Sequence, residues 1–156
     1  MNEQSPKAAS AASLTIVRRL PAPPERVFAA FTDPDLVRHW WGPEGCTSPD
    51  PQIDLRVGGH YRLDIQGSDG SLHRLSGRYL EISPPTRLAF TWTWTEGSYA
   101  GIETTVEVDL VAHGRETELT LTHSGFTSPE MCAAHRSGWE SSLTCLQRDA
   151  IERTAP

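Results

Sequence analysis

Hydrophobic and polar residues alternate with a period of two through much of the second half of the chain. Residues 87–95, 102–110 and 116–123 each carry apolar side chains at every second position, and His113-Gly114 turns the chain between the last two. Strict alternation indicates strands with one buried face and one solvated face. Because turns link these strands in succession, we expect an antiparallel meander.

Three other segments extend the predicted sheet. Residues 13–20 form a first strand that ends at a proline-rich segment, and residues 60–65 show the same alternation. Residues 71–82 continue as a strand after a Gly-Ser-Asp-Gly turn. We therefore expect a sheet of six to seven strands.

Helical spacing of apolar residues appears between the first strand and the rest of the sheet. Residues 27–31 repeat apolar side chains every three to four positions. A second short helix is predicted over residues 34–41, with Asp33 as its N-cap and Gly42-Pro43 as its end. Two short helices should therefore follow the first strand.

A longer helix is predicted near the C-terminus, where Ser128 is placed as N-cap and Pro129 as the first helical residue. About twenty residues follow without another proline. Such a helix needs an apolar surface to cover its apolar stripe, and one face of the sheet is the only large one predicted. The stripe consists of Met131, His135, Trp139, Ser142 or Leu143, Leu146 and Ala150.

These elements predict an α+β fold in which a curved antiparallel sheet wraps around one long C-terminal helix. Residues 1–12 are expected to be a flexible tail and residues 13–153 a single domain. A strongly curved sheet that grips one helix leaves space between them, and we expect an apolar ligand to bind there.

Composition and charge narrow the range of partners. The chain of 156 residues has a net charge of −6 and no basic cluster, which argues against nucleic acid and against a membrane surface as partner. No apolar run approaches the roughly 18 residues that span a bilayer. The three cysteines form no CxxC motif. We expect reduced thiols and a cytoplasmic location.

The sequence contains no familiar catalytic or cofactor motif. The six histidines form no metal-ligand pattern, no G-x-S-x-G elbow occurs, and Gly58-Gly59 belongs to no phosphate loop. We therefore expect neither a metal nor another cofactor. His135 is the only candidate catalytic residue. Three roles stay open for it: a hydrogen-bonded core group, a contact for a ligand carbonyl or hydroxyl, or an acid/base group.

Several short motifs, in this order, resemble the C-terminal domain of the activator of the heat-shock-protein-90 ATPase. That domain belongs to the START/SRPBCC superfamily with its helix-grip fold. The matching segments are residues 22–28 (APPERVF), 31–34 (FTDP), 40–43 (WWGP), 57–61 (VGGHY), 77–82 (GRYLEI), 90–92 (FTW) and 135–139 (HRSGW).

The resemblance implies the helix-grip fold over nearly the whole chain, but members of this family have varied roles. The eukaryotic co-chaperone carries a further N-terminal domain, and only a short tail precedes Ser13 here. A chaperone partner is therefore the less favoured expectation. A cavity enzyme of cyclase or hydrolase type that uses His135 is a further alternative.

The expected function is binding of a small apolar or aromatic molecule rather than catalysis. Within RHWWGPEG, we expect one of the two tryptophans to plug the core and the other to border the cavity mouth. Two exposed indoles would instead favour an interaction surface or a homodimer. The predicted ligand-binding residues are Trp40, Trp41, Tyr61, Phe90, Trp92, Trp94, His135, Trp139 and Leu143.

Overall fold

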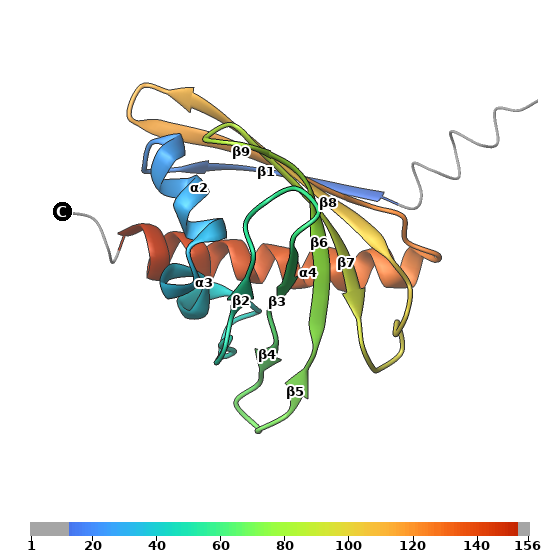
Figure 1. Ribbon diagram of the computed structural model, residues 1–156. Coiled ribbons are helices and arrows are strands. Elements are labelled where there is room, and N and C mark those ends of the chain that lie inside the picture. Colours follow the sequence, from blue (N-terminus) through green and yellow to red (C-terminus); the bar gives the residue numbers. More distant parts are fainter. Residues whose placement is uncertain (1–12, 153–156) are drawn as a thin grey trace, which may run out of the picture.

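A seven-stranded antiparallel sheet curves around one long C-terminal helix in the computed structural model, which describes residues 13–152 (Figure 1). The spatial order of the strands is β1-β9-β8-β7-β6-β3-β2. A separate pair, β4 (Ile65–Gln66) and β5 (Leu72–His73), forms a small hairpin. The strands of the large sheet are β1 (Ser13–Leu20), β2 (Gln52–Ile53), β3 (His60–Arg62), β6 (Leu75–Ser83), β7 (Arg87–Trp94), β8 (Thr104–His113) and β9 (Glu116–Ser124).

The helices begin where the sequence places their caps. The side chain of Asp33 accepts a hydrogen bond from the Asp35 amide, and that of Ser128 accepts one from the Met131 amide. Both caps were predicted and are confirmed. The helices are α2 (Pro24–Thr32), α3 (Pro34–Trp40), α4 (Pro129–Cys145) and the π-helical turn η1 (Leu146–Glu152).

Two predicted strands are broken in the structure. Residues 60–65 split at Asp64 into β3 and β4, and residues 71–82 split at Arg74 into β5 and β6. The β4–β5 hairpin forms a separate sheet, and the backbone of Thr47 pairs with Gln66 at its edge. The hairpin is therefore free to form one wall of a cavity.

The concave face of the sheet carries the core, and α4 lies across it (Figure 1). The predicted stripe on the C-terminal helix is buried from Met131 to Ala150. The helices α2 and α3 pack against η1, at the C-terminal end of α4. The sheet, the two short helices and the long helix together confirm the predicted helix-grip fold.

None of the helices within residues 13–152 is long and apolar enough to cross a membrane. The predicted flexible tail, residues 1–12, and residue 153 of the predicted domain lie outside the described residues.

Candidate functional site

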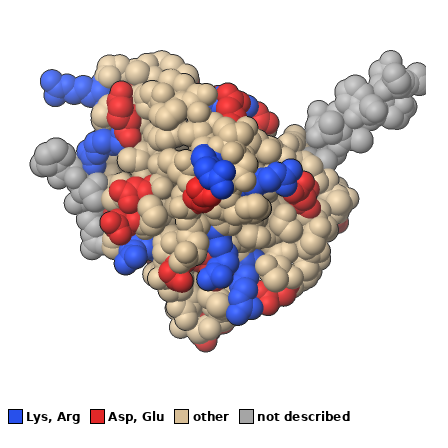
Figure 2. Space-filling view, viewed as in Figure 1, with Lys and Arg blue, Asp and Glu red and all other residues tan. Residues whose placement is uncertain are grey.

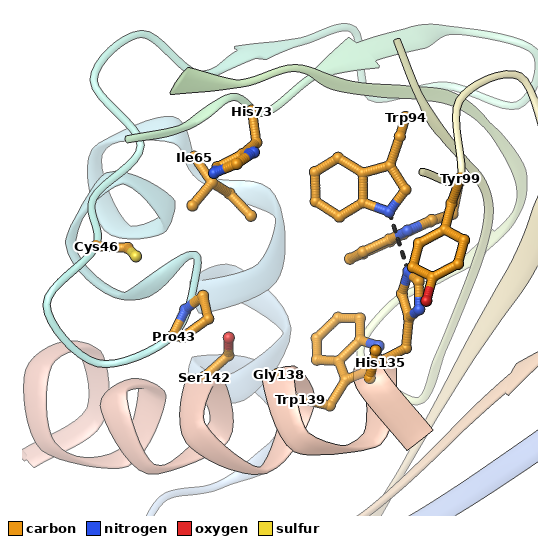
Figure 3. Close-up of a pocket in the computed structure, with 12 residues that line it drawn as sticks. Pro43, Cys46, Ile65, His73, Trp94, Tyr99, His135, Gly138, Trp139 and Ser142 are labelled. Atoms are coloured by element: carbon orange, nitrogen blue, oxygen red, sulfur yellow. Dashed lines mark hydrogen bonds between the residues drawn. The ribbon is translucent and has the colours of Figure 1, made fainter. Parts of the chain in front are cut away.

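A cavity of about 310 Å³ lies between α4, the end of β7, the β4–β5 hairpin and the loop after α3 (Figure 3). Within the described part of the chain, no Lys, Arg, Asp or Glu lines it. Pro43 and Cys46 form one side, and Trp94 and Tyr99 form the opposite side. The full lining consists of Pro43, Cys46, Ile65, His73, Trp92, Trp94, Tyr99, Ala134, His135, Gly138, Trp139 and Ser142.

Three tryptophans form the aromatic wall of the cavity. The ring centroid of Trp92 lies 5.2 Å from that of Trp139 and 5.6 Å from that of Trp94. Alternation places Trp92 and Trp94 on one face of β7, and helical spacing turns Trp139 toward them from α4. The rings contact one another in edge and tilted arrangements and together form a continuous apolar surface.

His135 is held in a single neutral tautomer at the edge of this wall. Its Nδ1 lies 2.8 Å from the carbonyl oxygen of Met131, which can only accept, so Nδ1 carries the proton. Its Nε2 lies 3.0 Å from Nε1 of Trp94, whose N–H can only donate, so Nε2 is the acceptor. Burial lowers the pKa of His135, in agreement with this neutral form.

His123 lies behind the cavity and is also neutral. Its Nδ1 accepts the indole N–H of Trp139 at 3.0 Å, so Nε2 carries the proton and donates to Oγ1 of Thr104 at 2.7 Å. The Thr104 hydroxyl donates in turn to the carbonyl oxygen of Trp92. Burial lowers the pKa of His123 well below its ordinary value.

The hydrogen bonds of His123 and His135 do not match those of a catalytic acid–base pair. Both nitrogens of each ring are already engaged, and the hydrogen-bond partners of His135 are a carbonyl and an indole rather than a carboxylate. A general base needs a free lone pair within reach of the proton that it removes. The one lone pair of His135 that faces the cavity is occupied by Trp94.

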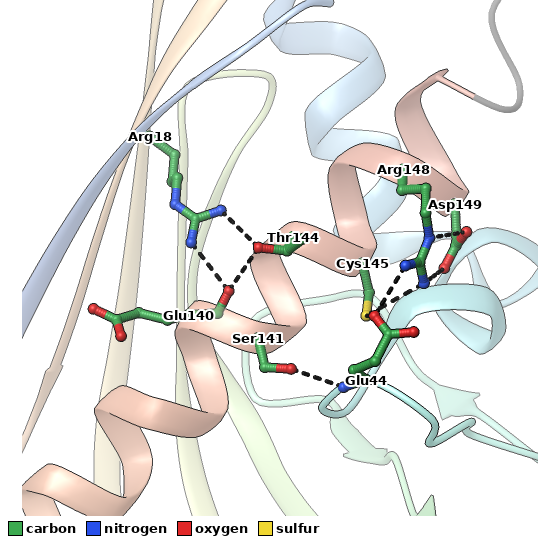
Figure 4. A network of polar contacts seen from close by, with 8 residues as sticks. All are labelled: Arg18, Glu44, Glu140, Ser141, Thr144, Cys145, Arg148 and Asp149. Atoms are coloured by element: carbon green, nitrogen blue, oxygen red, sulfur yellow. Dashed lines mark hydrogen bonds and ion pairs between the residues drawn. The ribbon is translucent and has the colours of Figure 1, made fainter.

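The loop after α3 forms the cavity side opposite Trp94 and is hydrogen-bonded to α4 and η1 (Figure 4). The amide of Glu44 donates to Oγ of Ser141 at 2.8 Å, and Arg148 donates to Oε1 of Glu44 at 2.9 Å. Gly42 has φ +108°, and a Cβ there would lie 2.9 Å from Cγ2 of Ile65. Glycine is therefore required where the chain turns toward the cavity.

Four of the nine predicted ligand-binding residues line this cavity: Trp92, Trp94, His135 and Trp139. The other five do not, although all are buried. Tyr61 on β3 and Phe90 on β7 contact each other, with ring centroids 5.5 Å apart. Both line only a small separate pocket of about 10 Å³. Leu143 belongs to the buried core.

The expected division of roles between Trp40 and Trp41 needs correction, because neither borders the cavity mouth. Trp40 does plug the core: it is 1% exposed, and its Nε1 donates to the carbonyl oxygen of Ala30 at 2.8 Å. Trp41 is 2% exposed and packs behind the cavity wall, 5.7 Å from Trp139. The short helix ends pointing inward, so both indoles enter the core.

Sequence reasoning missed several lining residues. Gly138 and Ser142 stand three and seven positions after His135 on the same helix face, so helical spacing could have found them. His73 is exposed and also lines the cavity. The contribution of Cys46 depends on how the loop folds back, which no local pattern reveals.

Acidic side chains on the outer face of the sheet form ion pairs, as in Arg78–Glu103 at 3.1 Å and Arg87–Glu107 at 2.6 Å, and Arg87 also pairs with Glu81 and Asp109. On the face seen in Figure 2, side chains of both signs are interspersed. Among the described residues, no group of three or more His, Cys, Asp or Glu side chains could hold a metal ion.

Comparison with known proteins agrees with this architecture. The family model described as activator of Hsp90 ATPase homolog 1-like protein matches residues 21–148. The chain belongs to this family. A START-like fold of this kind is consistent with ligand binding. A comparison with curated proteins found no match.

Solved structures of the same architecture come from several bacteria. Protein CV1439 from Chromobacterium violaceum is 30% identical over 90% of this chain and 97% of its own, with a TM-score of 0.79. The AHSA1 protein from Silicibacter pomeroyi is 30% identical over 88% and 96%, with a TM-score of 0.79. CalU16 from Micromonospora echinospora is 32% identical over 90% and 77%, with a TM-score of 0.68.

Proposed function

We propose that the protein binds a small, uncharged apolar or aromatic molecule in the cavity between the sheet and α4. The observation that carries this proposal is the cavity itself, at about 310 Å³ and walled by Trp92, Trp94 and Trp139. Sites for small molecules are concave and mostly apolar, with a few polar groups, and have volumes of roughly 300–1,000 Å³. An uncharged lining favours uncharged ligands, because an ion would lose its hydration without gaining a partner.

Gly138 gives further support. A glycine inside a helix costs roughly 0.5–1 kcal/mol relative to alanine. A Cβ placed on Gly138 would meet no atom within 4 Å, so packing does not require a glycine at this position. Its missing side chain leaves space on the cavity side of α4.

Burial of both Trp40 and Trp41 removes one of the two surfaces, the indole pair and the acidic outer face of the sheet, through which a protein partner could bind. An exposed pair of indoles would have favoured a protein partner or a homodimer. Both side chains instead belong to the core.

The proposal is tested by filling the cavity from Gly138. We expect 2-methoxynaphthalene, an uncharged bicyclic probe, to bind the wild-type protein saturably at one site in isothermal titration calorimetry. Gly138→Leu should weaken binding by about tenfold or more, since the new side chain occupies the ligand's space. Ala133→Leu adds the same side chain at an exposed position of α4 outside the cavity lining and should leave affinity unchanged. Absence of saturable binding by the wild type, or equal affinity in both variants, would contradict the proposal.

A further inference from the structure

We propose that the cavity selects aromatic ligands that carry a hydrogen-bond donor, such as a phenol or an indole, and that this donor binds Nε2 of His135. In this structure the indole N–H of Trp94 donates to that nitrogen at 3.0 Å. The inference rests on the proposed function and adds the chemical class of the ligand.

The orientation of His135 decides what the site can recognise. Because Nδ1–H is committed to the carbonyl of Met131, the nitrogen directed at Trp94 is an acceptor with no proton to give. An acceptor nitrogen forms a hydrogen bond with a ligand hydroxyl or N–H, and it repels the lone pair of a carbonyl or ether oxygen. The structure thus favours a hydroxyl contact over the carbonyl contact that the sequence left open.

The side chain of Trp94 has the same chemical features as the proposed ligand, which would displace it from His135. It is an aromatic ring with a single N–H donor, seated against His135 with ring centroids 6.2 Å apart. Trp94 is only half-buried and ends β7, just before the loop that carries Tyr99. A side chain at the end of a strand and in contact with solvent can rotate at less cost than a fully buried one.

The surroundings of His135 suit an aromatic ring. The ring centroid of Phe126 lies 5.0 Å from the imidazole, that of Tyr99 5.6 Å and that of Trp92 6.0 Å. No cation lines the cavity among the described residues, so a carboxylate would enter without a counter-charge. A neutral donor on an aromatic ring therefore meets both the shape and the polarity of the site.

Two other hydroxyl groups of the lining compete for the same role. Ser142 directs its oxygen into the cavity, and the Tyr99 hydroxyl lies near His135 in Figure 3. Either could accept a ligand donor, so a test must separate them from His135.

The test compares 2-naphthol with 2-methoxynaphthalene, which have the same ring system but differ in the donor. The measured quantity is the ratio of their dissociation constants from isothermal titration calorimetry. For the wild-type protein we expect 2-naphthol to bind about threefold to tenfold more tightly. Trp94→Phe keeps a ring but removes the competing donor, so the ratio should rise by a further factor of about three. His135→Phe removes the acceptor and should bring the ratio to about one.

Ser142→Ala and Tyr99→Phe each remove one of the competing hydroxyl groups, and if His135 is the acceptor, neither variant should abolish the preference for 2-naphthol. A wild-type ratio near one, a ratio that Trp94→Phe does not raise, or a ratio abolished by Ser142→Ala would each overturn the inference. The Trp94→Phe result decides the matter even if His135→Phe fails to fold. If neither naphthalene binds at all, the proposed function itself fails. If both bind equally, only this inference fails.

Discussion

Nε1 of Trp139 on α4 lies 3.0 Å from Nδ1 of His123 on β9, and this hydrogen bond joins the long helix to the sheet. His123 is fully buried and continues the contact through Thr104 on β8 to the backbone of β7. Every polar group in this chain has a partner, so the connection costs little to bury. It fixes the position of α4 over the sheet, and with it the width of the cavity.

Trp139→Phe should therefore destabilise the protein more than the loss of ring area alone predicts. The variant leaves Nδ1 of His123 buried without a donor, which costs roughly 1–3 kcal/mol. Urea unfolding followed by circular dichroism measures the change. Trp94→Phe is the matched comparison, because Nε2 of His135 then faces the cavity, where water can replace the indole. An equal loss in both variants would count against a special role for the buried pair.

The stability of the protein should fall as the pH falls below about 6.5. Burial lowers the pKa values of His123 and His135 in the folded protein, so the unfolded chain takes up protons that the folded chain does not. The free energy of unfolding then decreases by up to about 1.4 kcal/mol per pH unit for each histidine. Urea midpoints measured from pH 7.5 to 5.2 should show this slope.

A single variant assigns part of that slope. His135→Gln removes one titrating ring and should make the slope shallower. This pH range lies above the pH at which the carboxyl groups of Glu44 and Asp69 change the free energy of unfolding. Hydrogen bonds from Arg148 and Ser71 lower the pKa values of these two carboxyl groups, and that stabilisation is lost only as the pH falls below about 4.5. A flat profile down to pH 5.2 would refute the account of the buried histidines.

Loosening the loop after α3 should change ligand exchange more than stability. The double variant Glu44→Ala/Ser141→Ala removes the side chains that attach this loop to α4, and exposed contacts of this kind contribute little to unfolding free energy. Because Pro43 and Cys46 line the cavity, we expect 2-methoxynaphthalene to dissociate about threefold to tenfold faster in stopped-flow fluorescence. Arg19→Ala, which breaks an exposed ion pair with Glu116 away from the cavity lining, is the control. Unchanged dissociation in the double variant would mean that the loop does not limit exit.

Local patterns were sufficient for the main elements of the fold. Period-two alternation located β7, β8 and β9, and the Ser128-Pro129 pair located the start of α4, because each depends on neighbours in sequence. The same helical period placed His135 and Trp139 on the buried face. These are also the helix residues that meet Trp92 across the cavity.

Other parts of the site depend on contacts between segments that are far apart in the sequence, so local sequence patterns could not predict them. Alternation along β9 places His123 on the same face as Leu119 and Leu121, but its hydrogen bond with Trp139 comes from the distant helix α4. One of Trp40 and Trp41 was expected at the cavity mouth, but both rings are buried in the core. The wall around Ile65 belongs to the separate β4–β5 hairpin, at whose edge Thr47 pairs with Gln66.

The most direct test of ligand binding in this cavity uses the five tryptophan indole N–H groups as reporters of position. In ¹H–¹⁵N correlation spectra, assigned with single Trp→Phe variants, saturating 2-methoxynaphthalene should shift the signals of Trp94 and Trp139. The signal of Trp40, whose N–H donates to Ala30 outside the cavity lining, should stay in place. Unchanged Trp94 and Trp139 signals, or an equal shift at Trp40, would contradict binding between the sheet and α4.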